Sequence, residues 1–190
     1  MFKKLSKESK FIINYFKKFQ TFLELDKQTL NKILLVKNIL LDCQKRNNKV
    51  IIFGNGGSSS IANHFSVDIT KNAGIRSVTF NEVNLITCFA NDFGYENWIS
   101  RSINYYAKKN DVVIAISSSG NSKNIINACK VAKKIGIKKI ITLTGFAKNN
   151  KVSKLGCVNF WINSKIYNYV ENMHQIILLS IIDLIISTKR

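Results

Sequence analysis

The sequence contains no proline, and its 4 cysteines form no C-x-x-C pair. The absence of proline, together with abundant Lys, Asn and Ile, indicates a compositional bias that acts on the whole chain. The wide separation of the cysteines excludes a zinc ribbon and a dithiol redox motif. We therefore expect a reducing, cytoplasmic setting.

Long apolar runs are also missing. The longest, residues 176–186, is interrupted by Ser180 and Asp183 and falls short of the roughly 20 residues that span a bilayer. The apolar run at residues 11–16 is short and contains Asn14, which argues against a signal peptide. We expect a buried helix near the C-terminus and no membrane partner.

Acidic residues are scarce, with 11 Asp and Glu against 29 Lys and Arg, which gives a formal charge of +18. Such a charge ordinarily favours nucleic acid or another anionic surface as a partner. Here the lysines are dispersed in pairs, such as Lys17-Lys18 and Lys138-Lys139, which is typical of the solvated faces of helices. We therefore do not expect nucleic acid as a partner, although the charge favours anionic sugar phosphates.

Length and periodicity predict one α/β domain that covers residues 1–190, since a chain of this size can bury a substantial core. Helical spacing of apolar residues predicts an N-terminal helical hairpin over residues 1–46, ahead of an α/β core over residues 47–190. In the core, β-rich runs alternate with helices, which predicts a doubly wound, mostly parallel sheet with a long closing helix. The five predicted strands are residues 50–53, 77–80, 111–116, 139–144 and 158–162, and the closing helix is residues 167–186.

Two of the predicted strands end in turns rich in Gly and Ser, at residues 54–58 and 117–122. Parallel sheets bind ligands beyond the carboxyl ends of their strands, so we expect one shared site. Backbone N–H groups at the start of the following helices attract a phosphate, and serine hydroxyls add donors without charge. The alternative is that these serines only cap helices. A dinucleotide or P-loop site is not indicated, because residue 59 is Ser and no Gly-Lys-Ser/Thr occurs.

His64 and Asp68 lie four residues apart in the helix predicted after the first turn, and therefore on one face. This arrangement can hold a metal or transfer a proton. A histidine that only packs against its neighbour is the other interpretation.

In these segments the chain resembles the sugar-isomerase (SIS) domain family, and within it the phosphoheptose isomerases, which convert sedoheptulose 7-phosphate to a heptose 7-phosphate. The matching segments include residues 54–58, 90–96, 116–122 and 141–145. The resemblance implies a homotetramer that binds a phosphorylated sugar. The implied substrate contacts are Asn55, Gly56, Gly57, Ser58, Asn91, Asp92, Ser117, Ser118, Ser119, Ser122 and Glu171.

The resemblance also implies aldose–ketose isomerisation through an enediol, and in some members zinc. His64, Asp68 and Glu171 match the family positions that supply catalytic groups and metal ligands. Asp68 stands where the family has Glu, and Leu179 stands where it has its catalytic His, so the acid/base pair is incomplete. His174 matches a different family histidine.

Two functions remain open from the sequence. One is a phosphoheptose-isomerase-like enzyme that supplies precursors of lipopolysaccharide or capsule. The other is a non-catalytic SIS protein, either a phosphosugar-binding protein or a partner of the replication initiator DnaA, because a branch of the family resembling the DnaA-binding protein keeps the turns and lacks the catalytic His.

Overall fold

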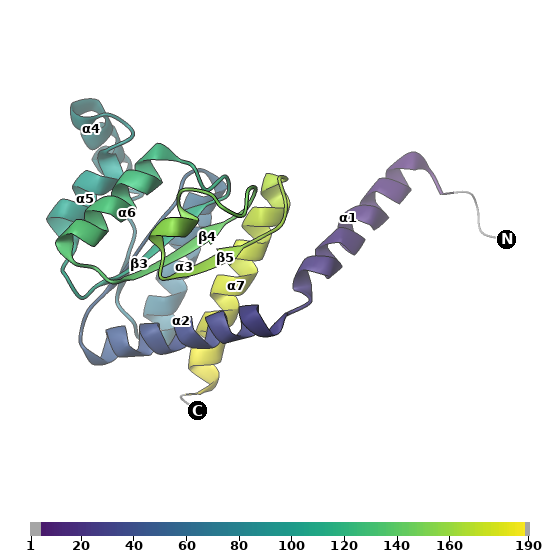
Figure 1. The fold of residues 1–190 in the computed structure, drawn as a ribbon, viewed down its shortest axis with the longest axis horizontal. Coiled ribbons are helices and arrows are strands. Elements are labelled where there is room, and N and C mark those ends of the chain that lie inside the picture. The colour runs from purple at the N-terminus through teal and green to yellow at the C-terminus, as the bar shows by residue number, and fades with distance from the viewer. Residues whose placement is uncertain (1–4, 189–190) are drawn as a thin grey trace.

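Five parallel strands form the centre of the molecule in the order β2-β1-β3-β4-β5. The computed structural model describes residues 5–188 (Figure 1). The strands are β1 (Val50–Phe53), β2 (Ser77–Val78), β3 (Val112–Ser117), β4 (Lys139–Thr144) and β5 (Val158–Trp161). The prediction of a doubly wound parallel sheet is confirmed, and β2 is shorter than predicted.

Seven α-helices surround this sheet within the described residues. They are α1 (Lys7–Leu23), α2 (Lys27–Lys45), α3 (Gly57–Ala73), α4 (Val83–Phe93), α5 (Trp98–Tyr106), α6 (Lys123–Ile135) and α7 (Tyr167–Ser187), with a short 3-10 helix η1 (Ser153–Leu155). Alternate residues of a strand face opposite layers. Val50 and Ile52 of β1 join a core with α2, α3 and α7, whereas Ile51 and Phe53 join a second core with α5 and α6.

The last helix, α7, is long and apolar enough to span a membrane by length and composition alone. Its apolar residues pack against α2 and α3 in the first core. The buried positions of α7 are Tyr169, Val170, Met173, His174, Ile177, Leu178, Ile181, Ile182 and Ile185. The prediction of a buried closing helix is therefore confirmed.

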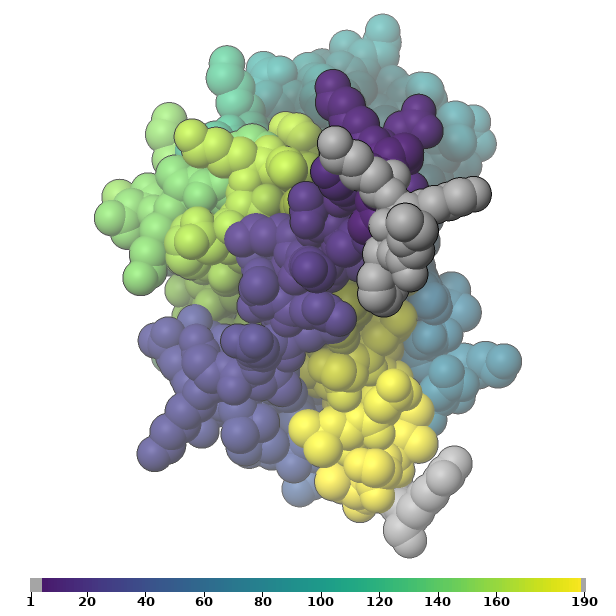
Figure 2. All heavy atoms as spheres, turned by 90° about the vertical axis from the view of Figure 1, so that its right-hand side faces the viewer, coloured from purple at the N-terminus to yellow at the C-terminus, as the bar shows by residue number. Residues whose placement is uncertain are grey.

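The first helix, α1, stands apart from this body. It begins at the N-cap Ser6 and has no buried residue, and it turns away from α2 (Figure 1). Seen from its own side, α1 projects toward the viewer over α2 and α7 (Figure 2). The two predicted N-terminal helices are present, but they form an open pair and not a closed hairpin.

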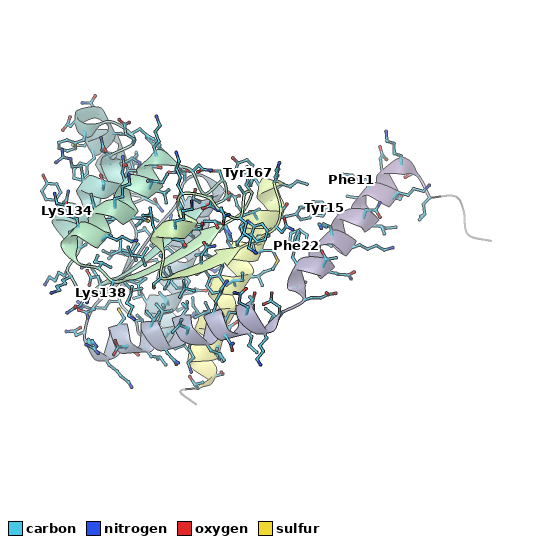
Figure 3. All side chains as sticks on the ribbon, in the orientation of Figure 1. Phe11, Tyr15, Phe22, Lys134, Lys138 and Tyr167 are labelled. Carbon is cyan, nitrogen blue, oxygen red and sulfur yellow. The ribbon has the colours of Figure 1, made fainter. Side chains whose placement is uncertain are left out.

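Aromatic side chains of α1 make its contact with the body. The ring of Tyr15 stacks on Tyr169 of α7 with centroids 4.6 Å apart, and Phe22 approaches the same ring at 5.7 Å. Phe11 lies farther out along the projecting helix (Figure 3). Lys134 and Lys138 lie at the opposite end of the molecule (Figure 3), in agreement with a dispersed positive charge.

Candidate functional site

The topology places the two Gly/Ser turns beside each other. After β1 the chain moves outward to β2 and then returns to β3 on the other side of β1. The carboxyl ends of β1 and β3 therefore form the crevice in which doubly wound sheets bind ligands. Phe53 pairs with Ala115, so the turn after β1 lies at the level of the end of β3.

A pair of amides joins the first turn to α6. Asn55 Nδ2 donates to Asn124 Oδ1 at 3.0 Å, and Asn124 Nδ2 donates back to Asn55 Oδ1 at 2.8 Å. The Tyr95 hydroxyl also donates to Asn55 Oδ1, at 3.2 Å. Sequence reasoning assigned no role to Asn124 or Tyr95. The signals for them were that both belong to the segments that resemble the SIS family, and that Asn124 lies two residues after the N-cap Ser122.

The second turn presents several serine hydroxyls at the start of α6. Ser117 Oγ and Ser122 Oγ are 3.2 Å apart, and Ser119 Oγ accepts from the backbone N–H of Asn121 at 3.2 Å. Ser118 Oγ is buried without a hydrogen-bond partner among the described residues. A buried hydroxyl without a partner is costly, so Ser118 keeps a hydrogen-bonding group unused at this turn, and its role as a ligand contact stays a prediction.

Close packing at Gly120 shapes this second turn. Its φ of 68° lies in the left-handed region, and a Cβ there would collide with the side chain of Asn150. Asn150 is itself buried and accepts from the backbone N–H of Ser153 at 2.8 Å. The serine turn is thus closely packed against Asn150 at Gly120.

Helix α7 brings Glu171 onto the first turn. A Cβ on Gly57 would overlap the Glu171 carboxylate, so the glycine leaves room for this carboxylate against the backbone of the first turn. Gly57 begins α3, and a carboxylate near the start of a helix is stabilised by the helix dipole. The structure therefore brings Glu171 beside Gly57, one of the predicted residues of the first turn, which also include Asn55, Gly56 and Ser58.

His64 and Asp68 form a pair on α3. His64 Nε2 and Asp68 Oδ2 are 3.2 Å apart, with side chains 47% and 31% exposed. On the other side of the ring, Gln175 Nε2 lies 3.2 Å from His64 Nδ1. Sequence reasoning missed Gln175, although it lies four residues after Glu171 and therefore on the same face of α7.

His174 is fully buried and anchors α7 to the end of β4. Its Nε2 lies 3.1 Å from the Thr144 carbonyl oxygen, so Nε2 carries the proton and donates it. Burial lowers the pKa of His174 to about 4, against the opposing effect of the Thr144 hydrogen bond. The imidazole is neutral at pH 7 and acts as a structural group one turn beyond Glu171.

Two predicted residues lie on α4 and are exposed. Asn91 Nδ2 donates to Asp92 Oδ1 at 3.0 Å, and the Cys88 thiol lies 3.7 Å from Asp92 Oδ2. No hydrogen bond or ion pair joins the side chains of Asn91 or Asp92 to the serine turn in the described part of the chain. Their place in the site stays a prediction.

The residues proposed for zinc do not form a zinc site. Within residues 5–188 no three His, Cys, Asp or Glu side chains converge to hold a metal. Both ring nitrogens of His64 face other side chains, and Leu179 is an apolar residue packed against the core. Tetrahedral zinc sites need at least three nitrogen, sulfur or oxygen ligands from the protein, so this donor set does not fit zinc.

Comparison with known proteins agrees with the fold. The SIS domain family matches residues 14–145. The chain belongs to the SIS domain family. It is 38% identical over 125 residues to the phosphoheptose isomerase of Histophilus somni, a segment that spans 63% of this chain and 64% of that protein. It is 34% identical over 142 residues to the phosphoheptose isomerase of Aliarcobacter butzleri, spanning 72% and 74% of the two chains.

The solved structure of phosphoheptose isomerase from Neisseria gonorrhoeae has the same fold as this SIS domain. The TM-score is 0.87 at 23% sequence identity, and the match covers 94% of this chain and 99% of that one. The parallel sheet and the helices that cover it are therefore those of the SIS fold.

Proposed function

We propose that this SIS domain protein binds a phosphorylated sugar across its two turns and acts as a phosphoheptose-isomerase-like enzyme on sedoheptulose 7-phosphate. The observation that carries this proposal is the buried, unpartnered Ser118 hydroxyl in a serine turn at the start of α6. An anion there meets unpaired backbone N–H groups and the positive end of a helix dipole. The similarity to enzymes named phosphoheptose isomerase supports the choice of sugar.

The phosphate lies on the serine turn in this proposal, and the reacting carbons lie toward Glu171 and the His64–Asp68 pair. Asp68 removes a proton from C1, beside the C2 carbonyl, while His64 or Glu171 gives a proton to the carbonyl oxygen, which yields the enediol. Asp68 then returns its proton to C2, and the C1 hydroxyl gives its proton back to His64 or Glu171 as the aldehyde forms. Each positioned acid or base contributes about 10² to 10⁴ in rate.

Deuterium exchange provides the test. We expect the protein in D2O to incorporate deuterium into sedoheptulose 7-phosphate, followed by NMR, and to form the aldose. Asp68→Asn abolishes the exchange, while Lys71→Ala, a change at an exposed residue later in the same helix, leaves it unchanged. Exchange that is unaffected by Asp68→Asn would show that the chemistry lies elsewhere.

A second candidate, binding without turnover, is favoured by Leu179, which supplies no acid or base and packs against the core. Such a protein is a phosphosugar-dependent binding partner of another protein, of the kind that binds DnaA. The Leu179→His variant separates the two. For the enzyme we expect increased exchange, since imidazole adds an acid/base group; a sugar-dependent increase in melting temperature with no exchange in either form supports the binding protein.

We further propose a cytoplasmic homotetramer that supplies precursors of surface polysaccharide. Support for self-association comes from α1, where Phe11 and Phe16 are 65% and 63% exposed. Exposed apolar surface of this kind marks interaction sites. Light scattering at micromolar concentration tests the assembly, and a monodisperse 21.6 kDa species contradicts it.

A further inference from the structure

We propose that Gln175 is a positioning residue that holds the imidazole of His64 with its proton on Nε2 and directed at Asp68. The inference rests on the proposed isomerase function, because His64 and Asp68 belong to the same site. It adds a third member, on a different helix, to the proton-transfer pair.

The Asp68 carboxylate decides which ring nitrogen carries the proton. A carboxylate only accepts, so His64 Nε2, 3.2 Å from Asp68 Oδ2, carries the proton and donates it. In a neutral imidazole Nδ1 is then bare and accepts with its lone pair. The Gln175 amide nitrogen, 3.2 Å from Nδ1, is the donor that suits it.

The position of Gln175 is fixed by the packing of α7. One turn earlier, Glu171 lies on Gly57, and the adjacent residue His174 is held by Thr144. A Cβ on Gly145 would lie 2.8 Å from the side chain of Val170, so the start of α7 is closely packed against the turn after β4. The Gln175 amide therefore lies beside His64 on a closely packed part of α7.

The His64 ring has little other restraint. Its side chain is 47% exposed, and in the described part of the chain its only hydrogen-bonding partners are Asp68 and Gln175. Without Gln175 the ring can rotate, and the short side chain of Asp68 follows it. A neutral hydrogen bond contributes about 1 kcal/mol, and one tenfold change in rate corresponds to 1.36 kcal/mol, so we expect a loss of roughly fivefold to tenfold in kcat.

The test compares Gln175→Met with Asn172→Met. Both replacements put methionine on α7, but Asn172 is exposed and donates to the Asn168 carbonyl oxygen. The chain has only 2 histidines, so ring nitrogen signals in ¹⁵N NMR belong to His64 or His174. We expect Gln175→Met to shift the His64 Nδ1 signal and lower kcat roughly fivefold to tenfold with little change in KM, while Asn172→Met changes neither.

A second variant reverses the polarity of the contact. The carboxylate of Gln175→Glu can only accept, so it draws a proton onto Nδ1, and NMR then shows Nδ1–H in place of a bare Nδ1. Unchanged His64 signals in both Gln175 variants overturn the inference, as does a changed signal with normal kcat. If the unmodified protein shows no turnover, the proposed isomerase function is refuted. The inference about Gln175 is then decided by the ¹⁵N NMR signals alone, which show whether the His64 proton lies on Nε2.

Discussion

The buried histidine of α7 makes the stability of the fold depend on pH. His174 has no exposed surface, and burial lowers its pKa from 6.5 to about 4. The unfolded chain takes up a proton near pH 6.5, whereas the folded chain does not until about pH 4. Acid therefore favours unfolding, and the stabilising contribution is present above pH 6.5 and is lost as the pH falls toward 4.

The expected loss in the free energy of unfolding follows from the difference between these two pKa values. Each pH unit inside the window changes the free energy of unfolding by about 1.4 kcal/mol, so lowering the pH from 7 to 5 removes about 2 kcal/mol. For a chain of this length, 2 kcal/mol corresponds to about 4–8 °C in melting temperature. Most carboxylates still remain ionised at pH 5.

Thermal or denaturant unfolding at pH 7 and pH 5 measures the effect. His174→Gln keeps a donor for the Thr144 carbonyl and removes the ionisable ring, so we expect it to lose most of the pH dependence. His64→Gln is the matched control, since it removes the other histidine. If the His174→Gln protein keeps the full dependence, or the His64→Gln protein loses it, the reasoning is refuted.

Three further predictions concern the site and the surface. Sedoheptulose 7-phosphate at 100 times its dissociation constant adds about 2.7 kcal/mol of stability, and Ser119→Ala with Ser122→Ala removes the resulting shift in melting temperature; a persistent shift contradicts the serine turn as the phosphate site. Gly120→Ala costs about 1–3 kcal/mol in denaturant unfolding, because its φ of 68° lies in the left-handed region and its Cβ would overlap the buried side chain of Asn150; an unchanged midpoint argues against this close packing. Phe11→Ser with Phe16→Ser lowers the mass measured by light scattering, unless α1 takes no part in assembly.

Local patterns were enough to predict the sheet and both turns. The β-rich runs of residues 50–53 and 139–144 coincide with β1 and β4, because fully buried parallel strands read as continuous apolar segments. Gly and Ser clusters then marked where strands end and helices begin, since these residues favour turns and helix N-termini. The four-residue spacing in the predicted helix likewise put His64 and Asp68 on one face of α3. Signals of this kind depend only on residues that are close together in the sequence.

Contacts between distant residues were decided by tertiary structure. Asn55 meets Asn124 across 69 positions, and His64 meets Gln175 across 111. No periodicity encodes such partners, because they depend on which strands neighbour each other and on how α7 packs against α3. The same packing set Glu171 on Gly57 and kept His174 neutral in the core. The sequence by itself determined the fold and the two Gly/Ser turns, and the strand order together with the packing of α7 determined which polar side chains meet at the site.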